Sequence, residues 1–290
     1  MMEPLDKILE SSQAHVVYGA QDVPVIRFKC FEDIPWLAHG FSTREGGVSE
    51  GIYKSMNLSF TRGDDPGAVR ENFRRFGRAV DMDWKKMVFA RQTHTVNVLP
   101  VGRKDWGKGI IKDTDYQDID GLITNEPDVS LVTFFADCVP LFLVDKNKKV
   151  IGASHSGWRG TVARMGAATV AAMREHYGCD PQNLVGVIGP SICGDCYEVS
   201  EDVAMAFKDA FGARPWEVFC RPKGGGKYLL DLWKANERVL SEAGIPREQI
   251  HVSGLCTHCH PDILWSHRSL GTARGSLAGF MMIREEGALG

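Results

Sequence analysis

Two histidines and one cysteine stand where short apolar segments of the chain end. His94 follows the apolar segment 87–90, Cys138 lies between two apolar segments in FFADCVP, and His155 follows the segment 150–153. Loops at strand ends line crevices on a rigid scaffold, and open α/β folds place their chemistry there. Two imidazoles and one thiolate suit zinc, and three protein ligands leave one position open, as in catalytic zinc sites. The three side chains are therefore candidates for a catalytic zinc centre.

The spacing of these three residues permits a second interpretation. Their separations along the chain match no local metal-binding motif. Single histidines are often satisfied structural residues, and an unpaired cysteine often behaves as a small buried apolar side chain. On spacing alone, the structural interpretation is favoured.

Two CxxC motifs offer a rival metal site, with two further histidines beside the second motif: Cys193, Cys196, Cys256, Cys259, His258 and His260. Paired CxxC motifs are typical of structural zinc. The two motifs are much further apart than in a zinc ribbon, and an expected helix lies between them. We therefore expect buried thiols here, with a second structural metal as the alternative.

Composition limits the class of protein. The 290 residues are 43% hydrophobic with a formal net charge of −3, so no basic surface for nucleic acid is expected. The first twenty residues lack the apolar core of a secretory signal, and no apolar run is long enough to span a bilayer. We therefore expect a cytoplasmic protein with no membrane partner, whose eight cysteines are thiols or metal ligands rather than disulfides.

Short apolar runs bounded by turn residues predict strands, at 23–28, 37–42, 87–90, 96–99, 121–124, 131–135, 139–144, 150–153, 184–188, 250–252 and 276–283. Helical spacing and capping residues predict helices, at 66–80, 161–177, 200–211 and 231–243. These elements predict a single α/β domain with mixed sheets over residues 23–290, preceded by a loose N-terminal extension over residues 1–22.

An ordered series of motifs resembles the laccase-domain family: HGFSTREGGVSEGIYKSMNL, GDD, RQTH, DGLIT, ADCVP, GASHSGWRGT, IGPSICGDCYEV, DLWKANERVLSEAGI and SHR. The resemblance runs from about Leu37 to the C-terminus. It implies a layered α/β/β/α sandwich with mixed sheets and a cysteine-hydrolase-like topology. It also implies zinc ligands in the Q-T-H, A-D-C and A-G-W-R-G-like motifs, which correspond here to His94, Cys138 and His155. Cys193 and Cys259, together with both histidines of CTHCH, are particular to this chain.

Members of that family are described as purine nucleoside phosphorylases with adenosine deaminase activity, and were formerly named polyphenol oxidases. The resemblance implies that a purine nucleoside and phosphate are the small-molecule partners. Adenosine or inosine would give free base and ribose 1-phosphate, and adenosine would also give inosine. The sequence leaves the preferred nucleoside open, as well as the choice between a monomer and a homodimer.

Phosphorolysis needs an anion site, and the glycine-rich turn at 43–51 suggests where it lies. Arg44 and Arg62 flank this region, with Ser55 and Asn57 between them as hydroxyl and amide partners. Arginine binds phosphate in a bidentate manner. Solvated loop charges are the competing interpretation for both arginines.

Two aspartates adjoin the candidate centre. Asp120 and Asp137 are acid/base candidates, and either is equally suited to orient a histidine ligand by a hydrogen bond.

Three alternatives stay open beside the zinc enzyme. Cys138 and His155 could be the nucleophile and base of a metal-free hydrolase. Two histidines and a cysteine could also hold copper in a polyphenol oxidase, although blue-copper sites add a weak axial methionine. A protein that only binds a partner has the least support.

Overall fold

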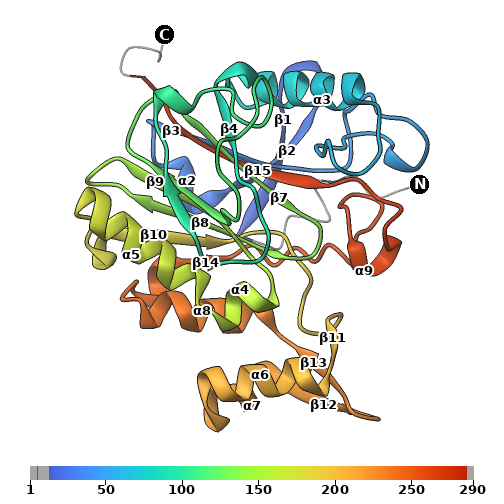
Figure 1. Ribbon diagram of the computed structural model, residues 1–290, viewed down its shortest axis with the longest axis vertical. Helices are drawn as coiled ribbons and strands as arrows, with labels where there is room; N and C mark the ends of the chain where they lie inside the picture. The colour runs from blue at the N-terminus through green and yellow to red at the C-terminus, as the bar shows by residue number, and fades with distance from the viewer. Residues whose placement is uncertain (1–4, 6–12, 286–290) are drawn as a thin grey trace.

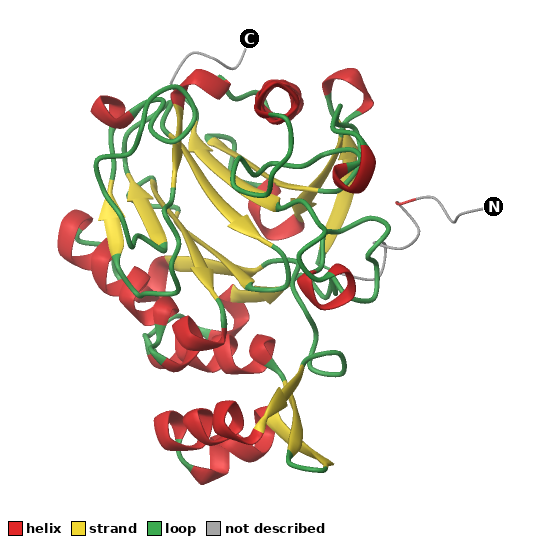
Figure 2. Ribbon diagram, turned by 45° about the vertical axis from the view of Figure 1, so that its right-hand side comes forward, coloured by secondary structure: helices red, strands yellow, loops and turns green. Residues whose placement is uncertain are grey.

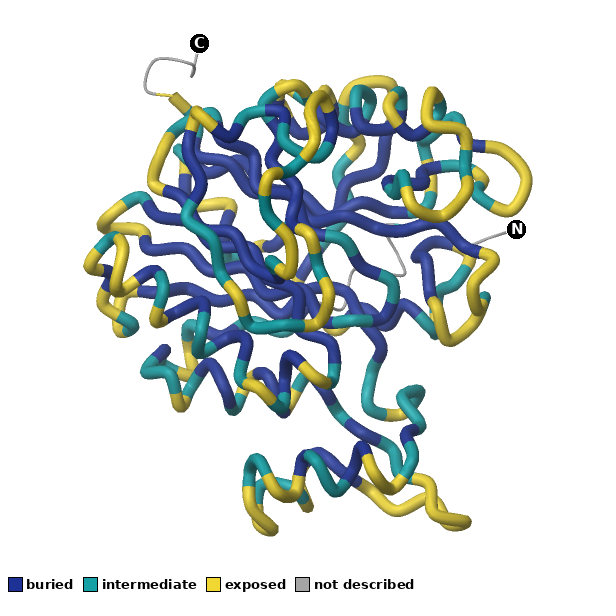
Figure 3. The backbone as a smooth tube through the Cα atoms, viewed as in Figure 1, coloured by how far each residue is buried: buried dark blue, intermediate teal, exposed yellow. Residues whose placement is uncertain are grey.

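Two mixed six-stranded sheets face each other at the centre of the part of the chain that the structure describes (Figures 1 and 2). The structure is a computed structural model, which describes Leu5 and residues 13–285. Strands of the two large sheets form the buried interior, and most exposed residues lie on the segments around them (Figure 3).

The first sheet is antiparallel except for the parallel pair β7 and β4 at one edge. In spatial order its strands are β1 (Ala14–Tyr18), β2 (Pro24–Phe28), β3 (Leu37–Ser42), β15 (Leu277–Ile283), β7 (Ser130–Phe135) and β4 (Met87–Phe89).

The second sheet is antiparallel in its centre and parallel at both edges. In spatial order its strands are β14 (Ile250–Val252), β10 (Leu184–Ile188), β8 (Val139–Asp145), β9 (Val150–Ser156), β6 (Gly121–Thr124) and β5 (Val98–Pro100).

The central strands are covered on both faces, which explains why they read as continuous apolar runs rather than as alternating patterns. Every residue of β8, β9 and β15 is buried. Between the sheets, the rings of Phe28 and Phe142 lie 5.5 Å apart. The Phe142 ring reaches so close to Gly279 of the facing sheet that a Cβ there would lie 2.3 Å from Cζ. A glycine in β15 is therefore what lets the two sheets approach at this point.

Helices cover the outer face of each sheet, which gives four layers. On the first sheet, α3 (Pro66–Ala79) is capped by the Asp65 carboxylate and packs Phe76 on Phe280, with ring centroids 4.6 Å apart. On the second sheet lie α4 (Trp158–Val162), α5 (Met165–Tyr177) and α8 (Leu232–Glu242).

A small lobe projects below the layers in Figure 1. It combines α6 (Glu201–Phe211) and α7 (Ala213–Phe219) with an antiparallel sheet of β11 (Glu198–Ser200), β13 (Lys227–Leu230) and β12 (Cys220–Gly224). The remaining short helices are α2 (Lys29–Glu32), α9 (His267–Leu270) and the 3-10 turns Ala20–Asp22, Gly51–Tyr53, Trp84–Lys86, Arg103–Asp105, Pro181–Asn183 and Arg247–Gln249.

The expected mixed α/β architecture is confirmed, with three differences in detail. Residues 14–18, which were expected in a loose extension, form β1 and pair with β2, because their apolar side chains complete the edge of the first sheet. Residues 1–4 and 6–12 of the expected extension lie outside the described residues. The helix expected at 161–177 is divided at Arg164, whose backbone is left-handed at φ 66°. The small sheet of the lobe was not expected. None of the helices in the described ranges has the length and apolarity needed to cross a membrane.

His39 in β3 makes stability depend on pH. The imidazole is buried between Phe28 and Phe31, and its Nε2 accepts a hydrogen bond from the Phe28 amide at 2.9 Å. Burial, together with nearby cationic groups, lowers the pKa of His39 to about 3. His39 is therefore protonated below about pH 6.5 in the unfolded chain but only below about pH 3 in the folded chain. The free energy of unfolding falls as the pH is lowered between these two values, because protons bind preferentially to the unfolded chain.

We expect the wild-type protein to lose about 2 kcal/mol more unfolding free energy between pH 7 and pH 5 than His39→Gln loses. Glutamine offers a neutral acceptor that does not titrate. Urea unfolding of both proteins at the two pH values measures the difference. Equal pH dependence in the two proteins would show that His39 titrates normally in the folded state.

Candidate metal centre

The chain passes from the first sheet to the second twice at the same end of the sandwich. Residues 90–97 join β4 to β5, and residues 136–138 join β7 to β8. Since β4 and β7 are parallel neighbours, both connections leave the first sheet side by side. His94 lies on the first connection and Cys138 on the second. His155 lies in β9 opposite Pro140 of β8, which brings it next to Cys138.

The donor atoms of His94, Cys138 and His155 all lie within 4.8 Å of one another. Bonds from zinc to nitrogen and sulfur of 2.0–2.3 Å are compatible with one ion between donors at such distances. Gly157 makes room for this arrangement, because a Cβ at that position would lie 2.8 Å from Nδ1 of His94 and 3.0 Å from Sγ of Cys138. The three residues expected to be ligands are thus brought together in a geometry that fits a zinc ion with one open position.

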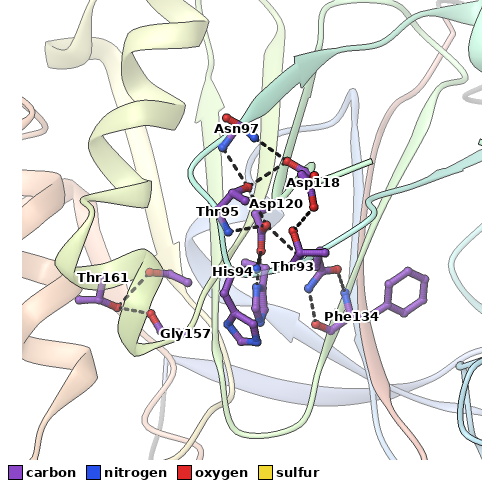
Figure 4. Close-up of polar contacts among 12 residues, drawn as sticks. Thr93, His94, Thr95, Asn97, Asp118, Asp120, Phe134, Gly157 and Thr161 are labelled. Atoms are coloured by element: carbon purple, nitrogen blue, oxygen red, sulfur yellow. Dashed lines mark hydrogen bonds and ion pairs between the residues drawn. The ribbon is translucent and has the colours of Figure 1, made fainter. Parts of the chain in front are cut away.

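Asp120 organises two of the three donors (Figure 4). Its carboxylate accepts hydrogen bonds from the backbone amides of Thr93, His94 and Thr95 at 2.8–3.1 Å. It also bonds Nδ1 of His155 at 2.8 Å, and its side chain is fully buried. Because Nδ1 of His155 is engaged in this way, Nε2 is the atom left for a metal.

The charges in this cluster are interdependent. Burial disfavours the imidazolium of His155, but the neighbouring Cys138 and Asp120 outweigh burial and raise the pKa of His155 to about 9. Burial likewise disfavours the Asp120 carboxylate, but the hydrogen bond and charge of His155, together with the Thr93 and Thr95 amides, jointly outweigh burial and lower the pKa of Asp120 to about 2. Burial and the nearby His155 lower the pKa of His94. A proton on His155 offsets the charge of the Asp120 carboxylate, and a bound cation would take the place of that proton.

A cavity of about 410 Å³ opens in front of the three donors. This volume falls in the range of sites for small molecules. Its lining combines aromatic rings with polar and cationic side chains, among them Phe134, Phe135, Gln92, Ser59, Arg62 and Arg274. Gln92 fixes the wall, since its side-chain amide donates to the Phe134 carbonyl at 2.8 Å and accepts from the Phe134 amide at 2.7 Å.

Three arginines line the cavity, Arg62, Arg91 and Arg274, and Arg62 and Arg274 reach it from segments far apart in the chain. Arg62 is exposed on the loop after the 3-10 turn Gly51–Tyr53, whereas Arg274 is 6% exposed and donates to the Gly275 carbonyl at 2.8 Å. Burial and the charge of Arg62 lower the pKa of Arg274 to about 10. Several cationic side chains that line one cavity near a candidate metal centre favour the binding of an anion. Sequence reasoning missed Arg274, because nothing in its local sequence marks it as a ligand of the cavity.

The other three residues expected to bind phosphate are engaged elsewhere in the structure. Arg44 stacks over Trp265 at 4.0 Å and donates to the carbonyls of Lys54 and Pro261. Ser55 donates to the Arg44 carbonyl. Asn57 is fully buried, donates to Asp64 and accepts from the Ser276 amide. Their polar groups form hydrogen bonds within the protein, and none of the three is among the residues that line the cavity.

Asp137 is also placed differently from the expectation. Its carboxylate accepts hydrogen bonds from the Thr257 hydroxyl and from the Arg268 amide, both at 2.6 Å. It touches no histidine among the interactions of the described residues, and its two hydrogen bonds tie the turn before Cys138 to Thr257 and Arg268. Of the two aspartates, Asp120 is the one that orients a histidine.

The two CxxC motifs converge despite their separation in the sequence. The four sulfur atoms of Cys193, Cys196, Cys256 and Cys259 all lie within 4.8 Å of one another, so the cluster could hold a metal such as zinc. The histidines of CTHCH lie outside this cluster; His258, for example, bonds the Ser269 hydroxyl through Nδ1 at 2.7 Å. We expected buried thiols here, with a second structural metal as the alternative, and the gathering of four thiols in one place favours that alternative.

Comparisons with known proteins found similar sequences and a similar fold. The family model described as multi-copper polyphenol oxidoreductase laccase matches residues 38–284. Purine nucleoside phosphorylase YlmD of Bacillus subtilis (strain 168) is 37% identical over 249 residues, which cover 85% of this chain and 88% of that protein. Adenosine deaminase RL5, from an unknown prokaryotic organism, is 34% identical over 238 residues, or 81% of this chain and 90% of that one. The crystal structure of the hypothetical protein YfiH of Bacillus licheniformis superposes with a TM-score of 0.86 at 30% identity, covering 93% of this chain and 99% of that chain.

Replacing Asp120 tests its control of the metal centre. In Asp120→Asn, the side-chain NH2 group would face backbone N–H groups, which cannot accept a hydrogen bond from it. The negative charge that holds His155 would also be lost. We expect zinc affinity to fall about 10–100-fold, as is usual for groups that orient a histidine ligand. Competition with a chromogenic zinc chelator measures the affinity. Asp118→Asn is the matched control, because Asp118 is exposed nearby and its carboxylate accepts a hydrogen bond from the Thr93 hydroxyl rather than from a candidate metal ligand. An equal loss of zinc affinity in both variants would contradict the role of Asp120.

Proposed function

The chain belongs to the multi-copper polyphenol oxidoreductase laccase family, and on this premise we propose that it is a zinc-dependent purine nucleoside phosphorylase with adenosine deaminase activity. The observation that carries the proposal is the convergence of His94, Cys138 and His155 at a cavity that three arginines also line. Relatives named as a purine nucleoside phosphorylase and as an adenosine deaminase support the same assignment. Adenosine or inosine and phosphate are the proposed substrates.

In phosphorolysis, a phosphate oxygen bonds to the anomeric carbon of the ribose while the bond from that carbon to the purine nitrogen breaks. The purine leaves with the electron pair and takes up a proton, which gives free base and ribose 1-phosphate. In our proposal Arg62 and Arg274 bind the phosphate and offset its charge. A zinc ion held by the three donors would supply Lewis acidity toward an oxygen nucleophile.

Deamination uses the same nucleoside with water in place of phosphate. Water adds to C6 of adenosine and ammonia leaves, which gives inosine. The aromatic side chains Phe134 and Phe135 line the cavity and are suited to contact the flat faces of a purine. The Asp120 carboxylate holds His155 in one orientation in both reactions. The two activities therefore share one cavity and differ in the nucleophile.

A metal-free hydrolase is the second candidate, and one observation favours it. His155 lies between Cys138, which contacts it, and Asp120, which bonds its other nitrogen at 2.8 Å. A nucleophile, a base and an orienting group in this order are the arrangement of a catalytic triad, and a cysteine-hydrolase-like topology is what the family resemblance implied. Activity that survives zinc chelation and is lost on alkylation with iodoacetamide would favour this candidate over the zinc enzyme.

Copper is the less suitable metal for this donor set. A blue-copper site adds a weak axial methionine to two histidines and a cysteine. Within the described ranges, no methionine lines the cavity. Zinc, which has no such requirement, is the better match to the residues present.

Incubation of the purified protein with adenosine, with and without phosphate, tests the function. Chromatography should show adenine with ribose 1-phosphate only when phosphate is present, and inosine under both conditions. His94→Ala, Cys138→Ala and His155→Ala should each abolish turnover and lower the zinc content, because each removes one of three ligands. Zinc-loaded protein that forms none of these products would contradict the assignment to nucleosides.

Removing one cationic group should affect phosphate specifically. We expect Arg62→Gln to raise KM for phosphate roughly 10–100-fold, since a hydrogen bond to a charged group contributes about 1.5–3 kcal/mol. KM for the nucleoside should change little. Arg78→Gln, an exposed arginine of α3 that does not line the cavity, is the control. An unchanged phosphate KM in Arg62→Gln would remove this residue from the anion site.

A further inference from the structure

The two CxxC motifs meet because of the sheet that precedes them. β10 and β14 are parallel neighbours, and each is followed by a loop that carries one motif. Carboxyl ends of parallel strands lie at the same edge of a sheet, so both loops emerge together. They continue to pair beyond the strands, since the Ser191 amide donates to the Leu255 carbonyl at 3.0 Å and the Thr257 amide donates to the Ser191 carbonyl at 3.2 Å.

We propose that Cys193, Cys196, Cys256 and Cys259 form a structural tetrathiolate zinc site, separate from the catalytic centre, that fastens these two loops and fixes the turn presenting Cys138. This site does not depend on the proposed function; only its effect on turnover does.

The sulfur geometry fits one tetrahedral ion. Four zinc–sulfur bonds of about 2.3 Å place the sulfur atoms about 3.8 Å apart. All four sulfur atoms lie within 4.8 Å of one another, and those of Cys196 and Cys259 are 3.5 Å apart. The first motif is already folded as a tight turn, with the Cys196 and Tyr197 amides donating to the Cys193 carbonyl at 3.1 and 3.0 Å. All four cysteines are free thiols.

The chemistry of the cluster selects a thiophilic metal. Asp195, the carboxylate inside the first motif, pairs with Arg221. Four soft ligands in tetrahedral order favour zinc or iron over magnesium or calcium. Binding of one Zn²⁺ would release four protons and leave a net charge of −2 on the site. The Cys193 amide, which points at Sγ of Cys256 at 3.3 Å, would offset part of that charge.

The site connects directly to the turn that carries Cys138. Thr257, between the second pair of cysteines, donates its hydroxyl to the Asp137 carboxylate at 2.6 Å. Ile192, next to Cys193, donates its amide to the Asp137 carbonyl at 3.0 Å. Asp137 itself has a left-handed backbone at φ 87°, which costs energy in a residue other than glycine unless surrounding contacts hold it. Both contacts come from loops that the zinc would fasten, so the site positions Cys138 through Asp137.

Metal analysis of the intact protein, purified under reducing conditions without added metal, tests the site. Native mass spectrometry and elemental analysis should find about two zinc ions per chain in the wild type and about one in Cys259→Ser, while His94→Ala also keeps about one. Cys30→Ser, which removes a thiol outside both clusters, should keep about two. Cobalt substitution of His94→Ala should give the visible absorption of a tetrahedral tetrathiolate. Unchanged zinc content in Cys259→Ser, or iron in place of zinc, would overturn the proposal.

The positioning role is tested without touching a thiol. Thr257→Val removes the hydroxyl that holds Asp137, so both zinc ions should stay while kcat falls about tenfold through misplacement of Cys138. KM for phosphate should stay unchanged, and Thr257→Ser should restore kcat because it keeps the hydroxyl. Wild-type kcat in Thr257→Val would overturn the positioning role. If the wild type turned over no nucleoside, the proposed function would fail, whereas the zinc counts would still decide the tetrathiolate site.

Discussion

The buried carboxylate of Asp120 is the interaction on which the candidate centre depends. A charge with no exposure to water must be satisfied by hydrogen bonds or paired charge, or it destabilises the fold. Asp120 meets this requirement with three consecutive amides of the His94 loop and with the His155 ring. The same bonds support the left-handed backbone of His94 at φ 67°. One side chain thus satisfies its own burial and fixes two metal donors that are far apart in the sequence.

The sandwich explains why the donors meet where they do. Two connections cross between the sheets at one end, and the one that carries Cys138 is anchored on both sides by largely buried strands, β7 and β8. The sheets can approach closely because Gly279 leaves space for the Phe142 ring. The order of the strands decides which loops become neighbours, so the packing of the two sheets also determines which side chains meet at the end where the connections cross.

Sequence reasoning succeeded where one physical signal dominated. Continuous apolar runs marked the buried strands, and the ordered motifs pointed to the three donors. It did not anticipate that side chains have competing uses: Arg44, Ser55 and Asn57 have the right chemistry for phosphate, but hydrogen bonds with backbone groups engage them. The strand Cys220–Gly224 was missed because all but its first residue are exposed, which leaves no apolar pattern. Convergence of the CxxC motifs depends on the parallel pairing of β10 and β14, which spacing along the chain does not reveal.

The crossing of the chain between the two sheets has a mechanical consequence. His94 and Cys138 lie on spans whose ends belong to different sheets, whereas His155 belongs wholly to the second sheet. Any sliding of one sheet over the other would distort the triangle of donors, and an ion bound within the triangle would resist that sliding. Metal occupancy and the rigidity of the whole sandwich are therefore thermodynamically linked, so that tight binding in the centre and stiffness between the sheets rise and fall together.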